Sequence, residues 1–233
     1  MRDVRPLFAA IASAALLCAA GPAAAQLQPQ GQGQGQYSEW ASYRDAYRAM
    51  VVFDKYGGPK HLLQSQLQVL PKDHAALGEG VQLTLAGKTT RLQLPLDPLG
   101  RTPLPLQKAA YDDNAALVLS KGISFTLRPL VAIAARPDGI YDSAELRTAC
   151  AQALDFARWT DASRRSRQCA GVRFVFRNKG EGGARLRHDG GQEENLPSQV
   201  GEEGLPVVVY RFAAARGQVV TGSVPLAILP VFE

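Results

Sequence analysis

The sequence predicts an α+β protein: an antiparallel β-rich domain, either sandwich-like or a sheet packed by two helices, with a C-terminal β extension. Three observations lead to this fold class. Apolar and polar residues alternate through much of residues 63–136, which is the period of strands with one wet face. A helix with a clear N-terminal cap follows Asp142, and three more apolar runs lie between residues 206 and 232.

The first 25 residues have the layout of a secretory signal peptide. Arg2 and Arg5 precede an apolar run from Leu7 to Ala20, and three alanines end the segment before Gln26. The run of about 14 residues is too short to span a bilayer as a helix. We therefore expect cleavage near Ala25-Gln26, a periplasmic or secreted mature protein, and no transmembrane segment after cleavage.

Residues 26–36 are predicted to be a flexible Gln/Gly-rich leader. They contain one apolar side chain and no charge, so burial cannot offset the entropy lost on ordering. Residues 37–233 are predicted to form a single α+β domain, with a subdivision near residue 178 left open.

An amphipathic helix is expected to begin near Ser38 and to end before Gly57. Its apolar positions recur at helical spacing and include Trp40, Tyr43, Tyr47, Met50 and Val51. Packing of this aromatic stripe onto a sheet is the main expectation, and a ligand-facing or membrane-facing surface is the alternative.

Antiparallel strands are expected next, because the apolar period changes to two. They cover residues 67–69, 81–85, 92–96, 116–119 and 123–127. Short Gly-containing turns are expected to join the second strand to the third and the fourth to the fifth as hairpins. Pro129 then interrupts the pattern, so residues 130–135 are either a bulged continuation or a separate strand.

The second helix begins at a variant of the capping box, in which Asp142 is followed three residues later by Glu145. Cys150 falls on its buried face. In an oxidising compartment we expect a disulfide between Cys150 and Cys169, which would staple the helix to the next strand. A catalytic thiolate is the competing interpretation, but the bond would remove the nucleophile.

The C-terminal third reads as further strands with one long loop. Strands are expected at residues 172–176, around Leu186, and at 206–212, 219–223 and 226–232. Residues 189–204 are polar and acidic, and are expected to form an exposed loop.

Several short motifs resemble an uncharacterised family of exported proteobacterial proteins, known as a domain of unknown function. They are Leu104-Pro105-Leu106, Asn114-Ala115, Ile123-Ser124-Phe125, Pro137-Asp138-Gly139 and Gly171-Val172-Arg173-Phe174. The resemblance covers roughly residues 38–177, and implies a signal peptide followed by a compact β-rich domain with one late helix. It supplies no activity, cofactor or catalytic residue, and the strands after residue 178 depart from it.

Charge and motifs argue against several classes of function. Without the signal peptide the chain has 24 basic and 20 acidic residues, a mild excess that does not indicate a nucleic-acid partner. The three histidines are not spaced as zinc ligands, and Gly87-Lys88-Thr89 lacks the upstream glycine of a phosphate-binding loop. We expect no catalytic residue, no cofactor and no metal.

One group of arginines forms a candidate binding surface. If residues 172–176 and the strand around Leu186 formed a hairpin, their outward arginines would share a face with an arginine-rich loop near the disulfide. The candidate residues are Arg164, Arg165, Arg167, Arg173, Arg177, Arg185 and Arg187. Guanidinium groups suit phosphate and carboxylate, so the expected partner is an anionic envelope component (a glycolipid, a phospholipid head group or an acidic polymer) or another envelope protein. A charged face that only keeps the protein soluble is the alternative.

The leading hypothesis is therefore a non-enzymatic, envelope-associated binding or scaffolding protein. The alternative is a cell-wall or glycan hydrolase that uses clustered carboxylates, with Asp112, Asp113, Glu193 and Glu194 as candidates. That chemistry requires two carboxyl groups facing each other across a cleft.

Overall fold

The computed structural model describes residues 39–73, 77, 80–178, 180, 183–212 and 217–233. The signal peptide, the cleavage position and the Gln/Gly-rich leader lie outside the described residues. Within them the chain is an α+β fold dominated by antiparallel strands, which confirms the predicted fold class.

The described strands form three antiparallel sheets. A seven-stranded sheet has the order β12-β13-β9-β15-β7-β2-β5. An N-terminal sheet has the order β1-β6-β3-β4, and a C-terminal sheet the order β11-β10-β14-β8. The strand bounds are β1 Trp40–Ser42, β2 Leu63–Pro71, β3 Gln82–Ala86, β4 Arg91–Pro95, β5 Arg101–Thr102, β6 Ala116–Leu119, β7 Phe125–Ile133, β8 Ile140–Asp142, β9 Cys169–Val175, β10 Ala184–His188, β11 Glu193–Leu196, β12 Ser198–Val200, β13 Pro206–Arg211, β14 Gly217–Thr221 and β15 Ala227–Phe232.

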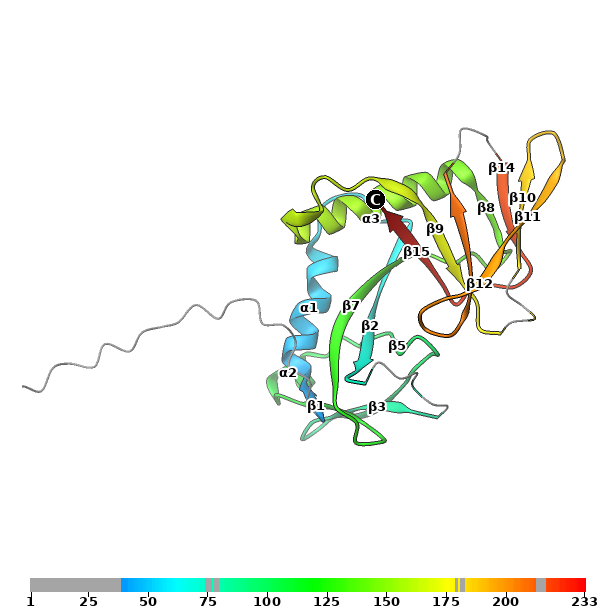
Figure 1. The fold of residues 1–233 in the computed structure, drawn as a ribbon. Helices are drawn as coiled ribbons and strands as arrows, with labels where there is room; N and C mark the ends of the chain where they lie inside the picture. Colours follow the sequence, from blue (N-terminus) through cyan, green and yellow to red (C-terminus); the bar gives the residue numbers. More distant parts are fainter. Residues whose placement is uncertain (1–38, 74–76, 78–79, 179, 181–182, 213–216) are drawn as a thin grey trace, which may run out of the picture. The chain divides into compact units, whose positions relative to one another are not determined.

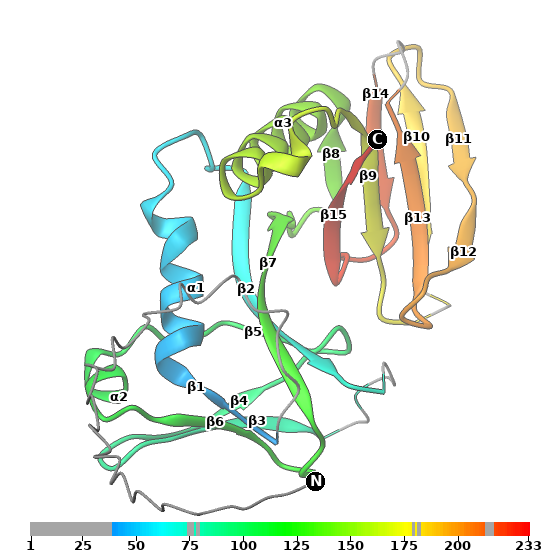
Figure 2. The same cartoon turned by 60° about the vertical axis from the view of Figure 1, so that its left-hand side comes forward.

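Two long helices and two short ones accompany these sheets in the described part of the chain. They are α1 Tyr43–Lys55, α2 Lys108–Asp112, α3 Ser143–Thr160 and the 3-10 turn η1 Ala162–Arg164. Helix α1 packs against β2 and β7, whereas α3 packs against β9, β15 and β7 (Figure 2). The predicted cap of α3 is confirmed, because Asp142 Oδ1 accepts hydrogen bonds from the backbone nitrogens of Ala144 at 2.8 Å and Glu145 at 3.3 Å.

Two large apolar clusters hold the fold together. One lies between the seven-stranded sheet, the C-terminal sheet and α3, and includes Phe174, Phe176 and Leu186. The other lies between the N-terminal sheet, α1 and the far halves of β2 and β7, and includes Tyr43 and Phe125. Strands β2 and β7 contribute to both clusters, so they link the two halves of the described fold.

The strands after residue 178 alternate with earlier ones in the seven-stranded sheet. Strand β15 lies between β9 and β7, and β13 pairs with the other edge of β9. The predicted C-terminal β extension is thus built from strands that share sheets with the residues before it.

Three details differ from the predictions. The first helix begins at Tyr43 rather than near Ser38, and Trp40 lies in β1, paired with Val118. Ser42 ends that strand and caps the helix, since its hydroxyl accepts from the backbone nitrogen of Asp45.

The expected hairpin between residues 116–119 and 123–127 is wrong. Strand β6 pairs with β1 and β3, and β7 pairs with β2 across the whole of its length. Pro129 lies inside this ladder opposite Leu67, as a continuation of one strand. A proline is tolerated there because β15 meets β7 only at Ile133, so the other side of Pro129 has no described strand to bond.

The expected loop at residues 189–204 is also wrong in part, because it contains β11 and β12. These strands lie at the outer edges of their sheets, and most of their residues are exposed. An edge strand with little buried surface lacks the apolar alternation that identifies a strand in sequence.

The predicted disulfide is present: Cys150 of α3 is bonded to Cys169 at the start of β9. It ties the helix to the strand whose inward side chains form the centre of the first cluster. A disulfide between cysteines is compatible with an extracytoplasmic protein.

Replacing both cysteines in a Cys150→Ala/Cys169→Ala variant should lower the free energy of unfolding by about 3 kcal/mol, since the closed ring no longer restricts the unfolded chain. Urea denaturation of the oxidised wild type and the variant measures the difference. Equal midpoints and slopes would contradict a stabilising bond.

A buried ion pair fixes the turn before β5. Asp97 Oδ2 lies 2.6 Å from Arg101 Nη2, and the side chains are 20% and 3% exposed. The same guanidinium donates to the carbonyl oxygen of Leu226 ahead of β15, so it joins the turn to the seven-stranded sheet.

Replacing Asp97 with Ala should destabilise the protein by about 3 kcal/mol, because the buried Arg101 guanidinium would lose its counter-ion. Asp155→Ala removes the exposed partner of Arg158 and should cost less than about 1 kcal/mol. If both variants show the same small loss in thermal or urea denaturation, the Asp97 pair does not have this role.

Candidate functional site

Residues 161–168 connect α3 to β9 and carry three of the predicted arginines. We call this segment the tethered loop. All eight residues are exposed, while the chain at both ends is fixed. The disulfide holds the end of the loop at Cys169, and Gln168 exchanges backbone hydrogen bonds of 2.7 and 3.0 Å with Glu233. The arginine side chains are therefore presented from a closed ring.

The interior of the tethered loop is ordered by polar contacts. Asp161 Oδ1 accepts from the backbone nitrogen of Ser163 at 2.9 Å, and Asp161 Oδ2 lies 3.3 Å from Arg164 Nε. Hydrogen bonds from Ser163 lower the pKa of the Asp161 carboxyl. With three arginines and one aspartate the loop carries a net charge of +2. Arg165 and Arg167 have no ion pair with any residue that the structure describes.

The C-terminal ends of α1 and α3 lie close together (Figure 1), and the residues there form an aromatic cluster that directly precedes the tethered loop. Phe156 of α3 packs edge to face against Phe53 and Tyr56, with ring centroids 5.4 and 5.3 Å apart. Trp159 lies 5.4 Å from Tyr56 and is 55% exposed, although its ring is the largest in the cluster. An exposed indole thus lies two residues before an exposed arginine-rich loop.

Arg158 joins this cluster to the loop. Its Nη2 donates to the carbonyl oxygen of Arg167 at 2.6 Å, and its Nη1 lies 3.4 Å from Asp155 Oδ1. The positions of Trp159 and the loop arginines are therefore coupled through the last turn of α3.

The structure does not gather all seven predicted arginines on one surface. Arg173 is on the outer face of β9, where Nη2 lies 3.3 Å from Glu203 Oε1. Arg177 follows the far end of that strand. It is eight positions further along the chain than Cys169, which corresponds to about 26 Å of extended chain.

The premise that residues 172–176 and the strand around Leu186 form a hairpin is wrong. Strand β9 is in the seven-stranded sheet, whereas β10 pairs with β11 and β14. Leu186 faces the core that it shares with Phe174, so Arg185 and Arg187 point away from β9. Both bond Glu193, at 3.0 and 2.9 Å. The structure thus brings the predicted residues together in two groups, Arg164, Arg165 and Arg167 on the tethered loop and Arg185 with Arg187 on β10.

The candidate acid residues of the hydrolase hypothesis lie on two different elements, helix α2 with its C-cap and strand β11, and all four have structural partners. Asp112 pairs with Lys108, and Asp113 Oδ2 accepts from Thr89 Oγ1 at 2.9 Å. Glu193 holds two arginines, and Glu194 lies 3.6 Å from His188. The first pair thus lies at the C-terminal end of α2 and the second pair on β11.

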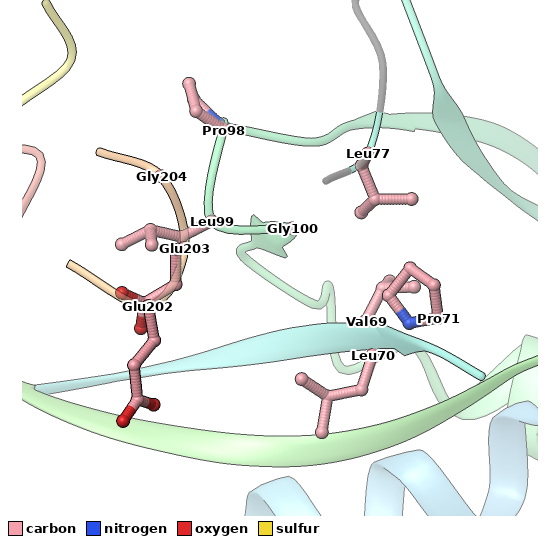
Figure 3. Close-up of a pocket in the computed structure, with 10 residues that line it drawn as sticks. All are labelled: Val69, Leu70, Pro71, Leu77, Pro98, Leu99, Gly100, Glu202, Glu203 and Gly204. Atoms are coloured by element: carbon pink, nitrogen blue, oxygen red, sulfur yellow. The ribbon is translucent and has the colours of Figure 1, made fainter. Parts of the chain in front are cut away.

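A hollow lies near the C-terminal end of β9, away from the tethered loop. A cavity of about 540 Å³ is lined by the end of β2, the turn at residues 98–100 and the loop at residues 202–204 (Figure 3). An adjoining cavity of about 500 Å³ shares Leu77, Pro98 and Glu203 with it, and also contains Asp97 and Arg177. We call the two together the lateral groove.

Sequence reasoning missed Trp159 and the lateral groove. An aromatic residue directly before an arginine-rich segment was a signal for the first. No short sequence motif indicates the groove, because one wall, residues 202–204, lies more than 100 residues along the chain from the others, residues 69–71 and 98–100.

No group of three or more His, Cys, Asp or Glu side chains in the described part of the chain is placed to bind a metal ion. No helix of that part is long and apolar enough to cross a membrane. Comparisons with family models, curated proteins and solved structures found no match for this chain. The family resemblance drawn from the short motifs therefore stays a prediction.

Asp113 is expected to have a structural role that depends on pH. Hydrogen bonds from Thr89 lower the pKa of its carboxyl, so the folded state favours the ionised form. The stabilisation is present above the unfolded pKa of about 4 and is lost as the pH falls through the lower folded value. Asp113→Ala should therefore lower the melting temperature at pH 6, and the difference should shrink towards pH 2. A constant difference across that range would contradict the assignment, and Asp112→Ala serves as the exposed control.

Proposed function

We propose that the protein is a non-enzymatic envelope-associated protein of the periplasm, or is secreted, and binds the anionic head groups of lipid surfaces. The observation that carries the proposal is the exposed Trp159 beside the three arginines of the tethered loop. The signal-like leader and the disulfide support the compartment.

The two kinds of side chain suit the two layers of a lipid interface. Arginine pairs with phosphate through a planar fork of donors, and each basic residue near an anionic surface adds about 1 kcal/mol. Tryptophan is enriched at membrane interfaces, because its ring is apolar and its N–H can still meet water. An acidic polymer in solution would satisfy the arginines but offer no apolar layer to the indole, which favours a lipid surface.

The expected binding is peripheral and reversible. Three arginines less one aspartate supply a few kcal/mol at most, which is below what permanent anchoring requires. Salt should weaken the binding, because these side chains are exposed and their charges are screened.

Flotation with vesicles of phosphatidylethanolamine and phosphatidylglycerol tests the proposal. Arg164→Gln/Arg165→Gln/Arg167→Gln should lower the partition coefficient by about 30- to 100-fold, as expected for the loss of three basic contacts. Trp159→Ala should weaken binding to vesicles and leave binding to soluble dextran sulfate unchanged.

The matched control is Arg91→Gln/Arg185→Gln/Arg187→Gln, which removes the same charge from positions outside the tethered loop, of which Arg91 and Arg185 are exposed and Arg187 is half-buried. It should retain most of the binding. Equal losses in the two triple variants, or equal binding to phosphatidylcholine vesicles, would contradict the proposal. Binding to dextran sulfate alone would assign the loop to an acidic polymer.

A further inference from the structure

The lateral groove has the size and lining of a ligand site. Its two adjoining parts, of about 540 and 500 Å³, each fall in the range of small-molecule pockets. The floor is apolar and includes Val69, Leu70, Pro71 and Leu99, while charged side chains lie at the walls. Figure 3 shows the loop of Glu202 to Gly204 on one side of the cavity and Val69, Pro71 and Leu77 on the other.

The charges of the groove can be counted residue by residue. Among the residues that the structure describes, four ionised side chains line it: Asp97, Arg177, Glu202 and Glu203. Asp97 is neutralised by Arg101 at 2.6 Å, and Glu203 by Arg173 at 3.3 Å. Glu202 and Arg177 remain, and neither has an ion pair with a described residue. Of the described residues, the groove therefore offers one unpaired negative group and one unpaired positive group beside the apolar floor of its first part.

The two charges lie in different parts of the groove. Glu202 lines the part that contains the end of β2, and Arg177 lines the part that contains Asp97 and Leu205. A molecule that satisfies both needs a cationic group and an anionic group, separated by an apolar body. A guanidinium is well shaped for a carboxylate, which it can bind with two parallel hydrogen bonds.

We propose that the lateral groove binds a short apolar peptide with free termini, with its ammonium group at Glu202 and its carboxylate at Arg177. Apolar side chains of the peptide pack on the floor formed by β2 and the turn at residues 98–100. This site is independent of the tethered loop, since it lies at the opposite end of β9.

Isothermal titration with a tetrapeptide of leucine and alanine tests the proposal, using forms with free termini, an N-terminal acetyl group or a C-terminal amide. Each cap should weaken binding to the wild type by about three- to five-fold, the value of a partly exposed ion pair. In Arg177→Gln the amide should no longer matter, while the acetyl group should still weaken binding. In Glu202→Gln the acetyl group should no longer matter, while the amide should still weaken binding.

Arg165→Gln and Glu194→Gln are the matched controls, and should respond to both caps as the wild type does. Equal melting temperatures of all variants establish that folding is unchanged. The proposal is overturned if the free tetrapeptide does not bind at about 5 mM, weaker than the usual range of specific ligands, or if neither variant changes the response to its cap. Because the vesicle experiment uses other residues, failure of one proposal leaves the other standing.

Discussion

The burial of alternate side chains of β9 is the constraint on which the rest of the structure depends. Val172, Phe174 and the following Phe176 are fully buried in the cluster shared by two sheets and α3. Both edges of β9 are paired, with β13 and β15, so its backbone is satisfied inside the sheet. The disulfide adds a covalent link to α3. Moving β9 by one residue would turn its aromatic rings to the outer face, so its register is strongly specified.

That fixed strand also positions both candidate sites. The tethered loop leads into β9 at Cys169. Arg177 lies two residues after the last residue of β9 and lines the lateral groove. Between them, the outward Arg173 binds Glu203 and brings the β12–β13 turn to the wall of the groove. The arginines of one local stretch of sequence are therefore divided between three environments. Those of the loop are open to solvent, Arg173 is paired with Glu203, and Arg177 lines the lateral groove.

Much of the fold could be predicted, because its causes are local. The cap at Asp142, the buried face with Cys150 and the alternation at residues 172–176 each act over a few residues, and each is confirmed. The pairing of β6 and β7 was mispredicted because strands adjacent in sequence usually pair, whereas here β6 is satisfied by β1 and β3. The prediction of one basic surface for all seven arginines is wrong for the same reason, because it paired residues 172–176 with the strand around Leu186, the next strand in sequence. Neither the exposure of Trp159 nor the neutralisation of Glu203 by Arg173 can be read from spacing, since both depend on distant segments.

The central claim is that Trp159 and the tethered loop together contact the lipid interface. Its most direct measurement is fluorescence quenching of Trp159 by doxyl-labelled phospholipids in anionic vesicles, in a Trp40→Phe variant that leaves one indole in the mature chain. The account predicts a blue shift on binding and strongest quenching by labels near the glycerol level, where tryptophan resides. An unshifted emission with no quenching, in protein that still floats with the vesicles, would contradict it.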